Sequence, residues 1–280
     1  MPQTGKHHPG DRESLLRFYA EAGHDEALAE EPVDRFAEAA KPAPAGQATE
    51  NTPRTRPEGR QEAPAAPPPP ATRAAVPDEQ QAMRARALAR EAKTLEELRA
   101  GLETFDGCNL KLTAKNLVFA DGNPQARVMF VGEAPGRDED LQGLPFVGRS
   151  GQLLDRMLSA IGFDRTSVYI SNVIPWRPPG NRDPSPLETE ICRPFIERHI
   201  ELVAPKVLVT LGNPSTKLLL QTQTGIMRMR GKWAEHETAG GSRIATMPTL
   251  HPAYLLRNPA HKKLAWRDFL EVKLRLNSPG

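Results

Sequence analysis

Residues 127–161 read RVMFVGEAPGRDEDLQGLPFVGRSGQLLDRMLSAI. The first part, RVMFV at 127–131, is a short apolar run that is typical of a buried β-strand. The last part, 151–161, predicts a helix with one apolar face, made by Leu153, Leu154, Met157 and Leu158. A glycine-rich loop at 132–148 joins the two. A strand, a loop and an amphipathic helix in this order indicate an α/β protein.

The same alternation of strands and helices continues toward the end of the chain. Further strands are expected at 168–173, 207–211 and 244–249, and further helices at 187–203, 214–220 and 262–276. Such alternation predicts a mostly parallel sheet of four strands that is covered by helices on both faces. In these sheets ligands bind at the carboxyl ends of the strands. The loops expected to form a functional site are therefore those after Val131, Val173, Leu211 and Leu250.

The N-terminal part of the chain has a different composition. Residues 1–40 are interpreted as a tail in which 13–23, ESLLRFYAEAG, is a possible short helix. Residues 41–78 are rich in Pro and Ala and nearly lack large apolar side chains, so they are predicted to be a disordered linker. Residues 79–101 have leucines at helical spacing and open a domain predicted over 79–280. The segment 13–23 fits either a partly ordered terminal helix, which we favour, or a docking peptide for a partner protein.

Charge and cysteine content narrow the class of protein. Residues 1–100 carry 14 Lys and Arg against 17 Asp and Glu, whereas 101–280 carry 23 against 18. The C-terminal part is thus the candidate for meeting a polyanion, although so small an excess only permits nucleic-acid binding. No apolar run approaches the ~20 residues that span a bilayer, and Met1–Gly10 lacks the apolar segment of a secretory signal. We expect a cytoplasmic monomer without a membrane anchor, whose two cysteines form no structural disulfide.

Three of the four strand-end loops carry groups that suit a binding pocket. The first loop contains GEAPG at 132–136 and GLPFVG at 143–148. The second contains Asn172 and then RPPGNR at 177–182, and the third is HPAYLLR at 251–257. One carboxylate, one carboxamide, one imidazole and one aromatic ring are expected to meet at one edge of the sheet. These four groups predict a small polar pocket that binds a planar heterocycle.

These loops lie in longer runs that resemble the signatures of an enzyme family. The runs are GEAPGRDEDLQGLPFVGRSGQLLDRML at 132–158, NVIPWRPPGNRDP at 172–184 and HPAYLLRNP at 251–259. Together they resemble the family 4 uracil-DNA glycosylases over residues 105–275, in the correct order and spacing. The resemblance implies a three-layer α/β/α fold around a central four-stranded parallel sheet. It also implies a monofunctional hydrolase of base-excision repair, which cleaves the N-glycosidic bond of a flipped-out deoxyuridine in DNA and leaves an abasic site.

The resemblance implies which residues hold the base. Phe146 stands where the family has its stacking ring, and stacking tolerates any base because every base has a π-face. Asn172 is placed to donate to uracil O4 and to accept from uracil N3–H. Cytosine presents the opposite pattern, so each mismatched buried group costs about 1–3 kcal/mol. Gly132 and Ala134 belong to the loop whose backbone is expected to border the base.

Three side chains are expected to carry the reaction. Bond cleavage places negative charge on the leaving uracil and positive charge on the sugar. By resemblance, His251 hydrogen-bonds uracil O2 as the negative charge develops, while Asn172 holds the same base. Glu133 either orients or deprotonates the attacking water or stabilises the cationic sugar, and the sequence leaves these roles open. Each residue alone would be interpreted as an ordinary loop or cap residue, so the functional interpretation depends on the long ordered match.

DNA contacts are expected beside the same loops. Leu255 lies in the third loop, where an apolar side chain can fill the gap left by a flipped base. Arg257 is placed to bind a phosphate. Arg177 and Arg182 flank Gly180 in the second loop and are candidates for clamping the DNA backbone on the other side.

The family pattern breaks at its cysteines. Family 4 members hold a four-iron, four-sulfur cluster through four cysteines, and this chain has Phe105, Cys108, Trp176 and Cys192 at those positions. Two thiolates cannot hold a cluster that takes four. We therefore expect no iron–sulfur cluster, no other metal and no cofactor. The rings of Phe105 and Trp176 are expected to fill the space instead.

The sequence leaves two other classes of protein as alternatives to an active glycosylase. One is a catalytically inactive protein that binds uracil or DNA, against which the complete set of site residues argues. The other is a repair or replication assembly factor that docks on a partner through residues 13–23 and uses the fold as a scaffold. The expected partner is uracil-containing DNA, and a repair or replication protein is a possible second partner through the N-terminal segment.

Overall fold

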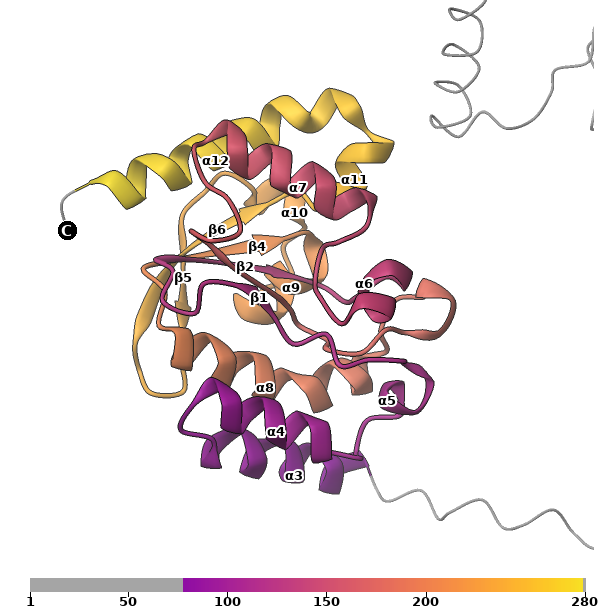
Figure 1. The fold of residues 1–280 in the computed structure, drawn as a ribbon. Coiled ribbons are helices and arrows are strands. Elements are labelled where there is room, and N and C mark those ends of the chain that lie inside the picture. Colours follow the sequence, from indigo (N-terminus) through magenta and orange to yellow (C-terminus); the bar gives the residue numbers. More distant parts are fainter. Residues whose placement is uncertain (1–77, 279–280) are drawn as a thin grey trace, which may run out of the picture. The chain divides into compact units, whose positions relative to one another are not determined.

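Six strands form one sheet in the computed structural model of the protein, which describes residues 78–278 (Figure 1). Their order across the sheet is β1-β3-β2-β4-β6-β5. The strands are β1 (Asp121–Gly122), β2 (Val128–Gly132), β3 (Tyr169–Asn172), β4 (Val207–Leu211), β5 (Ala234–Glu237) and β6 (Arg243–Thr249). The expected tail at 1–40, its possible helix at 13–23 and the linker at 41–78, apart from its last residue, lie outside the described residues.

The four central strands, β3, β2, β4 and β6, run parallel to one another, which confirms the expected parallel sheet. Strand β1 pairs antiparallel with β3, and β5 pairs antiparallel with β6. The apolar pattern predicts neither edge strand, because β1 has only two residues and β5 reads AEHE. The sheet therefore has six strands, with the expected four at its centre.

Helices cover the sheet and connect its strands. In the described residues they are α3 (Asp78–Glu91), α4 (Leu95–Thr104), α5 (Leu110–Thr113), α6 (Arg137–Gln142), α7 (Arg149–Ala160), α8 (Pro186–Val203), α9 (Asn213–Leu219), α10 (Ile226–Met229), α11 (Pro252–Arg257) and α12 (Lys262–Asn277). The single helix expected at 79–101 is two helices, because Thr94 caps a new one. Its side chain accepts a hydrogen bond from the Glu97 backbone N–H at 3.2 Å.

The two faces of the sheet bury separate hydrophobic cores. Figure 1 shows α7, α11 and α12 on one side of the sheet and α3, α4 and α8 on the other. Side chains alternate along each strand, so Val128 and Phe130 of β2 enter the core beneath α7 and α12. Met129 and Val131 enter the core beneath α4 and α8. This is the three-layer α/β/α arrangement.

Parallel pairing aligns the carboxyl ends of the central strands. Gly132 of β2 lies opposite Asn172 of β3, and Leu211 of β4 lies opposite Thr249 of β6. The loops that follow these residues therefore emerge at the same edge of the sheet. None of the helices of residues 78–278 has the length and hydropathy that a membrane span requires.

Candidate active site

A cavity of about 490 Å³ lies at this edge. Its lining includes Glu133 after β2, Asn172 at the end of β3, Asn213 after β4 and His251 after β6. Phe146, from the loop between α6 and α7, lines it too. The four side chains that sequence reasoning placed in a pocket thus share one cavity, whose volume suits a small molecule.

Phe146 and His251 lie next to each other in the wall of the cavity. The centroids of their rings are 5.5 Å apart and the ring planes meet at 32°. Phe146 has a φ of 55°, in the left-handed region that residues other than glycine rarely adopt. Its carbonyl oxygen leaves no space for a side chain at Gly151, where an added Cβ would lie 1.7 Å away. The position of the Phe146 ring therefore depends on an unusual backbone conformation.

Asn172 is buried beside Gly132, its partner residue on β2. Its Oδ1 atom has no hydrogen-bond donor within the described residues. A Cβ at position 132 would lie 2.4 Å from that oxygen and 2.6 Å from Cζ of Phe146, so glycine alone leaves space for both side chains. A buried acceptor without a donor costs about 1–3 kcal/mol. An N–H group on a ligand can remove this cost.

His251 is the N-cap residue of α11. Its Nδ1 accepts a hydrogen bond from the backbone N–H of Ala253 at 3.1 Å, so the ring proton of the neutral imidazole is on Nε2. Burial, helped by the positive charge of Arg257, lowers the pKa of His251 to about 4. At pH 7 the ring is therefore neutral and has one N–H donor, at Nε2.

Glu133 is the first residue after β2, and it lines the cavity together with Ala134. Burial raises the pKa of the Glu133 carboxyl group above its usual value. The negative charge of Asp183, which also lines the cavity, raises this pKa further. A carboxylate with a raised pKa in a cavity is a candidate for general-base chemistry.

The two arginines of the second loop have different positions. Arg182 lines the cavity, and its guanidinium donates two hydrogen bonds to the carboxylate of Glu188, at 2.8 and 2.6 Å. Arg177 does not line the cavity, and its Nε donates to Oδ1 of Asn181 at 2.7 Å. The structure therefore brings Arg182 to the site and leaves Arg177 outside it.

The third loop differs from the sequence expectation at one residue. Leu255 is fully buried, in a small core with Leu250 and Ala265, so it does not offer the exposed apolar side chain that a DNA wedge needs. The reason is that residues 252–257 form α11, and this turn points Leu255 toward the protein interior. Tyr254 and Arg257 line the cavity instead.

Several polar residues at the site were not among those predicted from the sequence. Asp183 and Ser150 line the cavity from within the quoted signature runs, where no role was assigned to them, and Asn213 lines it from outside those runs. Glu139 is buried and accepts hydrogen bonds from the backbone N–H groups of Gly136, Val147 and Gly148, at 3.0, 3.0 and 2.9 Å. It thereby ties the two glycine-rich segments of the first loop together. The sequence did carry a signal for Glu139, because it lies three residues after Gly136, which is the spacing of a capping box at a helix N-terminus.

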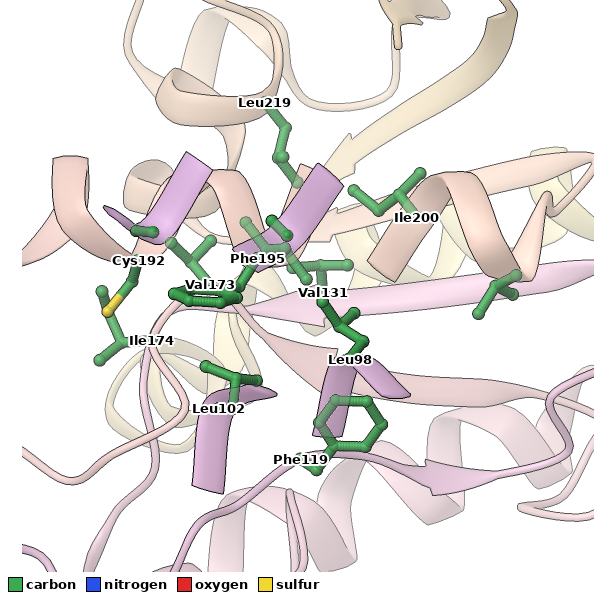
Figure 2. Packing of buried hydrophobic residues seen from close by; sticks show 14 of the residues in the cluster. Leu98, Leu102, Phe119, Val131, Val173, Ile174, Cys192, Phe195, Ile200 and Leu219 are labelled. Atoms are coloured by element: carbon green, nitrogen blue, oxygen red, sulfur yellow. The ribbon is translucent and has the colours of Figure 1, made fainter. Parts of the chain in front are cut away.

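The four positions at which the resembled family has cysteines lie in one buried cluster. Phe105, Cys108, Trp176 and Cys192 are each at most 2% exposed, and Figure 2 shows Cys192 and Phe195 within this cluster. The Sγ atoms of the two cysteines are 3.9 Å apart, and the Phe105 ring packs edge-on against Phe195. In the described part of the chain, no group of three or more His, Cys, Asp or Glu side chains is placed to hold a metal ion. These residues do not fit a cluster that takes four thiolates.

Known proteins are similar to this chain over most of the described domain. The family model of the uracil DNA glycosylase superfamily matches residues 119–270. The type-4 uracil-DNA glycosylase of Sulfurisphaera tokodaii is 39% identical over 188 residues, which cover 64% of this chain and 84% of that protein. Its namesake from Saccharolobus solfataricus is 42% identical over 176 residues, covering 61% and 81%. The one from Archaeoglobus fulgidus is 42% identical over 169 residues, covering 59% and 84%.

Proposed function

The chain belongs to the uracil DNA glycosylase superfamily, and we propose that it is a uracil-DNA glycosylase, which hydrolyses the N-glycosidic bond of deoxyuridine in DNA and leaves an abasic site. The observation that carries the proposal is the convergence of Glu133, Phe146, Asn172 and His251 on one cavity. These residues supply a ring, an amide, a neutral N–H donor and a carboxylate. Each of these groups can serve one step in the excision of a flipped uracil.

Base capture uses the ring and the amide. The uracil must leave the helical stack before its glycosidic bond is accessible. Phe146 then offers a surface on which any base can stack. Asn172 selects uracil through two hydrogen bonds. Its buried Oδ1, which has no donor among the described residues, accepts from uracil N3–H, and its Nδ2 donates to uracil O4. Cytosine offers no hydrogen at N3, so the buried oxygen would stay unpaired.

Departure of uracil uses His251. As the C1′–N1 bond breaks, its electron pair moves to the base and negative charge accumulates on O2. The Nε2–H of the neutral imidazole donates a hydrogen bond to that oxygen. A second proton at Nδ1 would face the Ala253 N–H, which already donates to this atom. The cap of α11 therefore fixes both the tautomer and the direction of the donor.

Addition of water uses Glu133. The water oxygen forms the new bond to C1′, and one of its protons has to be removed. A carboxylate can accept this proton, and while ionised it also stabilises positive charge on the sugar. Asp183 adds a second negative charge to the same part of the cavity. Both roles require Glu133 to be ionised when the reaction begins.

DNA binding is proposed to use the cations at the cavity. Arg257 is the last residue of α11, the helix that His251 caps, and it lines the cavity where it is available for a phosphate. Arg182 also lines it, with its guanidinium oriented by Glu188. We keep Arg177 as a more distant contact to the DNA backbone, because it belongs to the same loop.

The remaining expectations about cofactor, partners and location belong to this proposal. We propose that the protein binds no iron–sulfur cluster, and the burial of Phe105 and Trp176 supports this. Iron analysis and a visible absorption spectrum of the aerobically purified protein test it, and stoichiometric iron would refute it. We also propose a cytoplasmic monomer, with residues 13–23 as the docking segment if a repair or replication protein binds the chain.

The decisive experiment measures excision directly. The full chain is incubated with an oligonucleotide that contains one uracil, and abasic sites are then converted to strand breaks with alkali. We expect a break at the uracil and none in the matched thymine oligonucleotide. Glu133→Gln serves as the control for catalysis by this cavity and is expected to reduce the break strongly. Binding of the uracil oligonucleotide without any break would refute the enzyme and favour an inactive binding protein.

A further inference from the structure

Arg165 binds the two backbone carbonyl groups on either side of the Cα atom of Phe146. Its Nη1 donates to the carbonyl oxygen of Pro145 at 3.0 Å, and its Nη2 donates to the carbonyl oxygen of Phe146. Two carboxylates hold the same guanidinium. Nη1 pairs with Asp121 at 2.6 Å and Nε pairs with Asp155 at 2.9 Å. Arg165 thus joins the start of β1, helix α7 and the loop that carries the ring.

The loop needs such support because Phe146 is strained. A φ of 55° is unfavourable for a residue with a side chain, and it persists only where the surroundings enforce it. Gly151 encloses the Phe146 carbonyl from one side, since a Cβ there would lie 1.7 Å from the oxygen. Arg165 binds the same oxygen. The carbonyl that sets the direction of the ring is therefore fixed by two separate contacts.

We propose that Arg165 is a positioning residue for base excision, which fixes the carbonyls of Pro145 and Phe146 and so holds the Phe146 ring where the flipped base stacks. The inference depends on the proposed function, because the position of the ring matters only if a base stacks on it. Arg165 is absent from the cavity lining, so it acts through Phe146. Only a planar guanidinium has the forked donors for two carbonyls and two carboxylates, and a lysine ammonium does not.

A double-mutant cycle tests this role in the full chain. The four proteins are the wild type, Arg165→Lys, Phe146→Ala and the double variant, and the measurement is the single-turnover rate of uracil excision. We expect Arg165→Lys to lower the rate about tenfold, because the strained conformation is no longer enforced. In the Phe146→Ala background the same change should alter the rate less than about twofold. An equal loss in both backgrounds would overturn the proposal.

Arg198 provides a matched control for general destabilisation. Its side chain is 25% exposed, as is that of Arg165, and its guanidinium also binds a backbone carbonyl and a carboxylate. It lies on α8, in the opposite helical layer. We expect Arg198→Lys to change the melting temperature about as much as Arg165→Lys while leaving excision within about twofold of the wild type. A similar loss of excision in both variants would overturn the positioning role.

A milder variant covers the case in which Arg165→Lys does not fold. Asp155→Asn removes one of the two carboxylates that orient the guanidinium, and the Asp155 side chain is 45% exposed. We expect a loss of about threefold in excision that again disappears in the Phe146→Ala background. A loss that persists there would overturn the proposal.

The outcomes separate this inference from the function on which it depends. If the wild type excises no uracil, the proposed function fails and the inference fails with it. If the wild type excises uracil and Phe146→Ala has no effect, the function stands, but the stacking role of Phe146 and the inference that depends on it both fail. If Phe146→Ala lowers excision and Arg165→Lys does not, only the role of Arg165 fails.

Discussion

Replacing Gly132 by alanine adds one methyl group between the two side chains that we propose hold the base. The ideal position of that Cβ lies 2.4 Å from Oδ1 of Asn172, and 2.6 and 2.8 Å from two ring carbons of Phe146. Real Cβ atoms essentially never approach other atoms so closely, so Asn172 or Phe146 must move. The φ of Gly132 is not positive, so alanine itself adds no backbone strain and the fold should be kept.

The size of the effect follows from overpacking, which costs about 1–3 kcal/mol in a well-packed site. If this cost falls on the bound transition state, kcat/KM for uracil excision decreases about 5- to 160-fold. If it also falls on the free protein, the melting temperature decreases by about 2–12 °C for a domain of this size. The assay is excision from a uracil oligonucleotide with alkaline cleavage, run beside a thermal melt of the same preparation.

Gly101→Ala is the matched control for this substitution. A Cβ at Gly101 has no neighbour within 4 Å, and the residue lies inside α4, where alanine is favoured over glycine by about 0.5–1 kcal/mol. We expect wild-type excision and an unchanged or higher melting temperature. Wild-type excision by a folded Gly132→Ala variant would refute the view that Asn172 and Phe146 must keep their observed positions.

Other cavity residues have their own expected outcomes. Asn172→Asp keeps an acceptor and loses the donor to uracil O4, so the preference for uracil over cytosine should fall at least about tenfold in paired excision assays; an unchanged preference would contradict base reading by Asn172. His251→Ala should lower kcat about 10²–10³-fold with little change in DNA affinity, and equal losses of both would contradict the donor role. On the acid side, kcat/KM should fall as pH drops through the raised pKa of Glu133, and again near pH 4 as His251 gains a proton. Asp183→Asn removes a like charge and lowers the Glu133 pKa, so the first step should move to lower pH; a profile that does not move would count against this pairing.

Local patterns determined the framework of the domain. The apolar run at 127–131 forms β2 within one residue, and the run at 207–211 forms β4 without a shift. The spacing of apolar residues depends on the local conformation of the chain, which is why it predicted these strands and the helices between them. Because parallel strands end at one edge, the same patterns also predicted that the loops carrying Asn172 and His251 would meet.

The spacing of apolar residues did not predict the edge strands or the break between α3 and α4. Strand β1 consists of Asp121 and Gly122, and its pairing with β3 is set by a neighbour more than forty residues away. The break between α3 and α4 depends on one capping hydrogen bond at Thr94. Neither feature changes the hydrophobic pattern, so apolar periodicity does not predict it, although the three-residue spacing of Thr94 and Glu97 is that of a capping box and was a usable signal for the second helix.

Tertiary structure alone decided which side chains reach the cavity. Tyr254 and Leu255 are neighbours in one loop signature, yet the turn of α11 buries Leu255 and leaves Tyr254 at the cavity. The left-handed backbone of Phe146, its carbonyl against Gly151 and its bond to Arg165 join segments that have no local relation. Such contacts depend on where whole strands and helices place distant residues, and no periodicity within one segment encodes that placement.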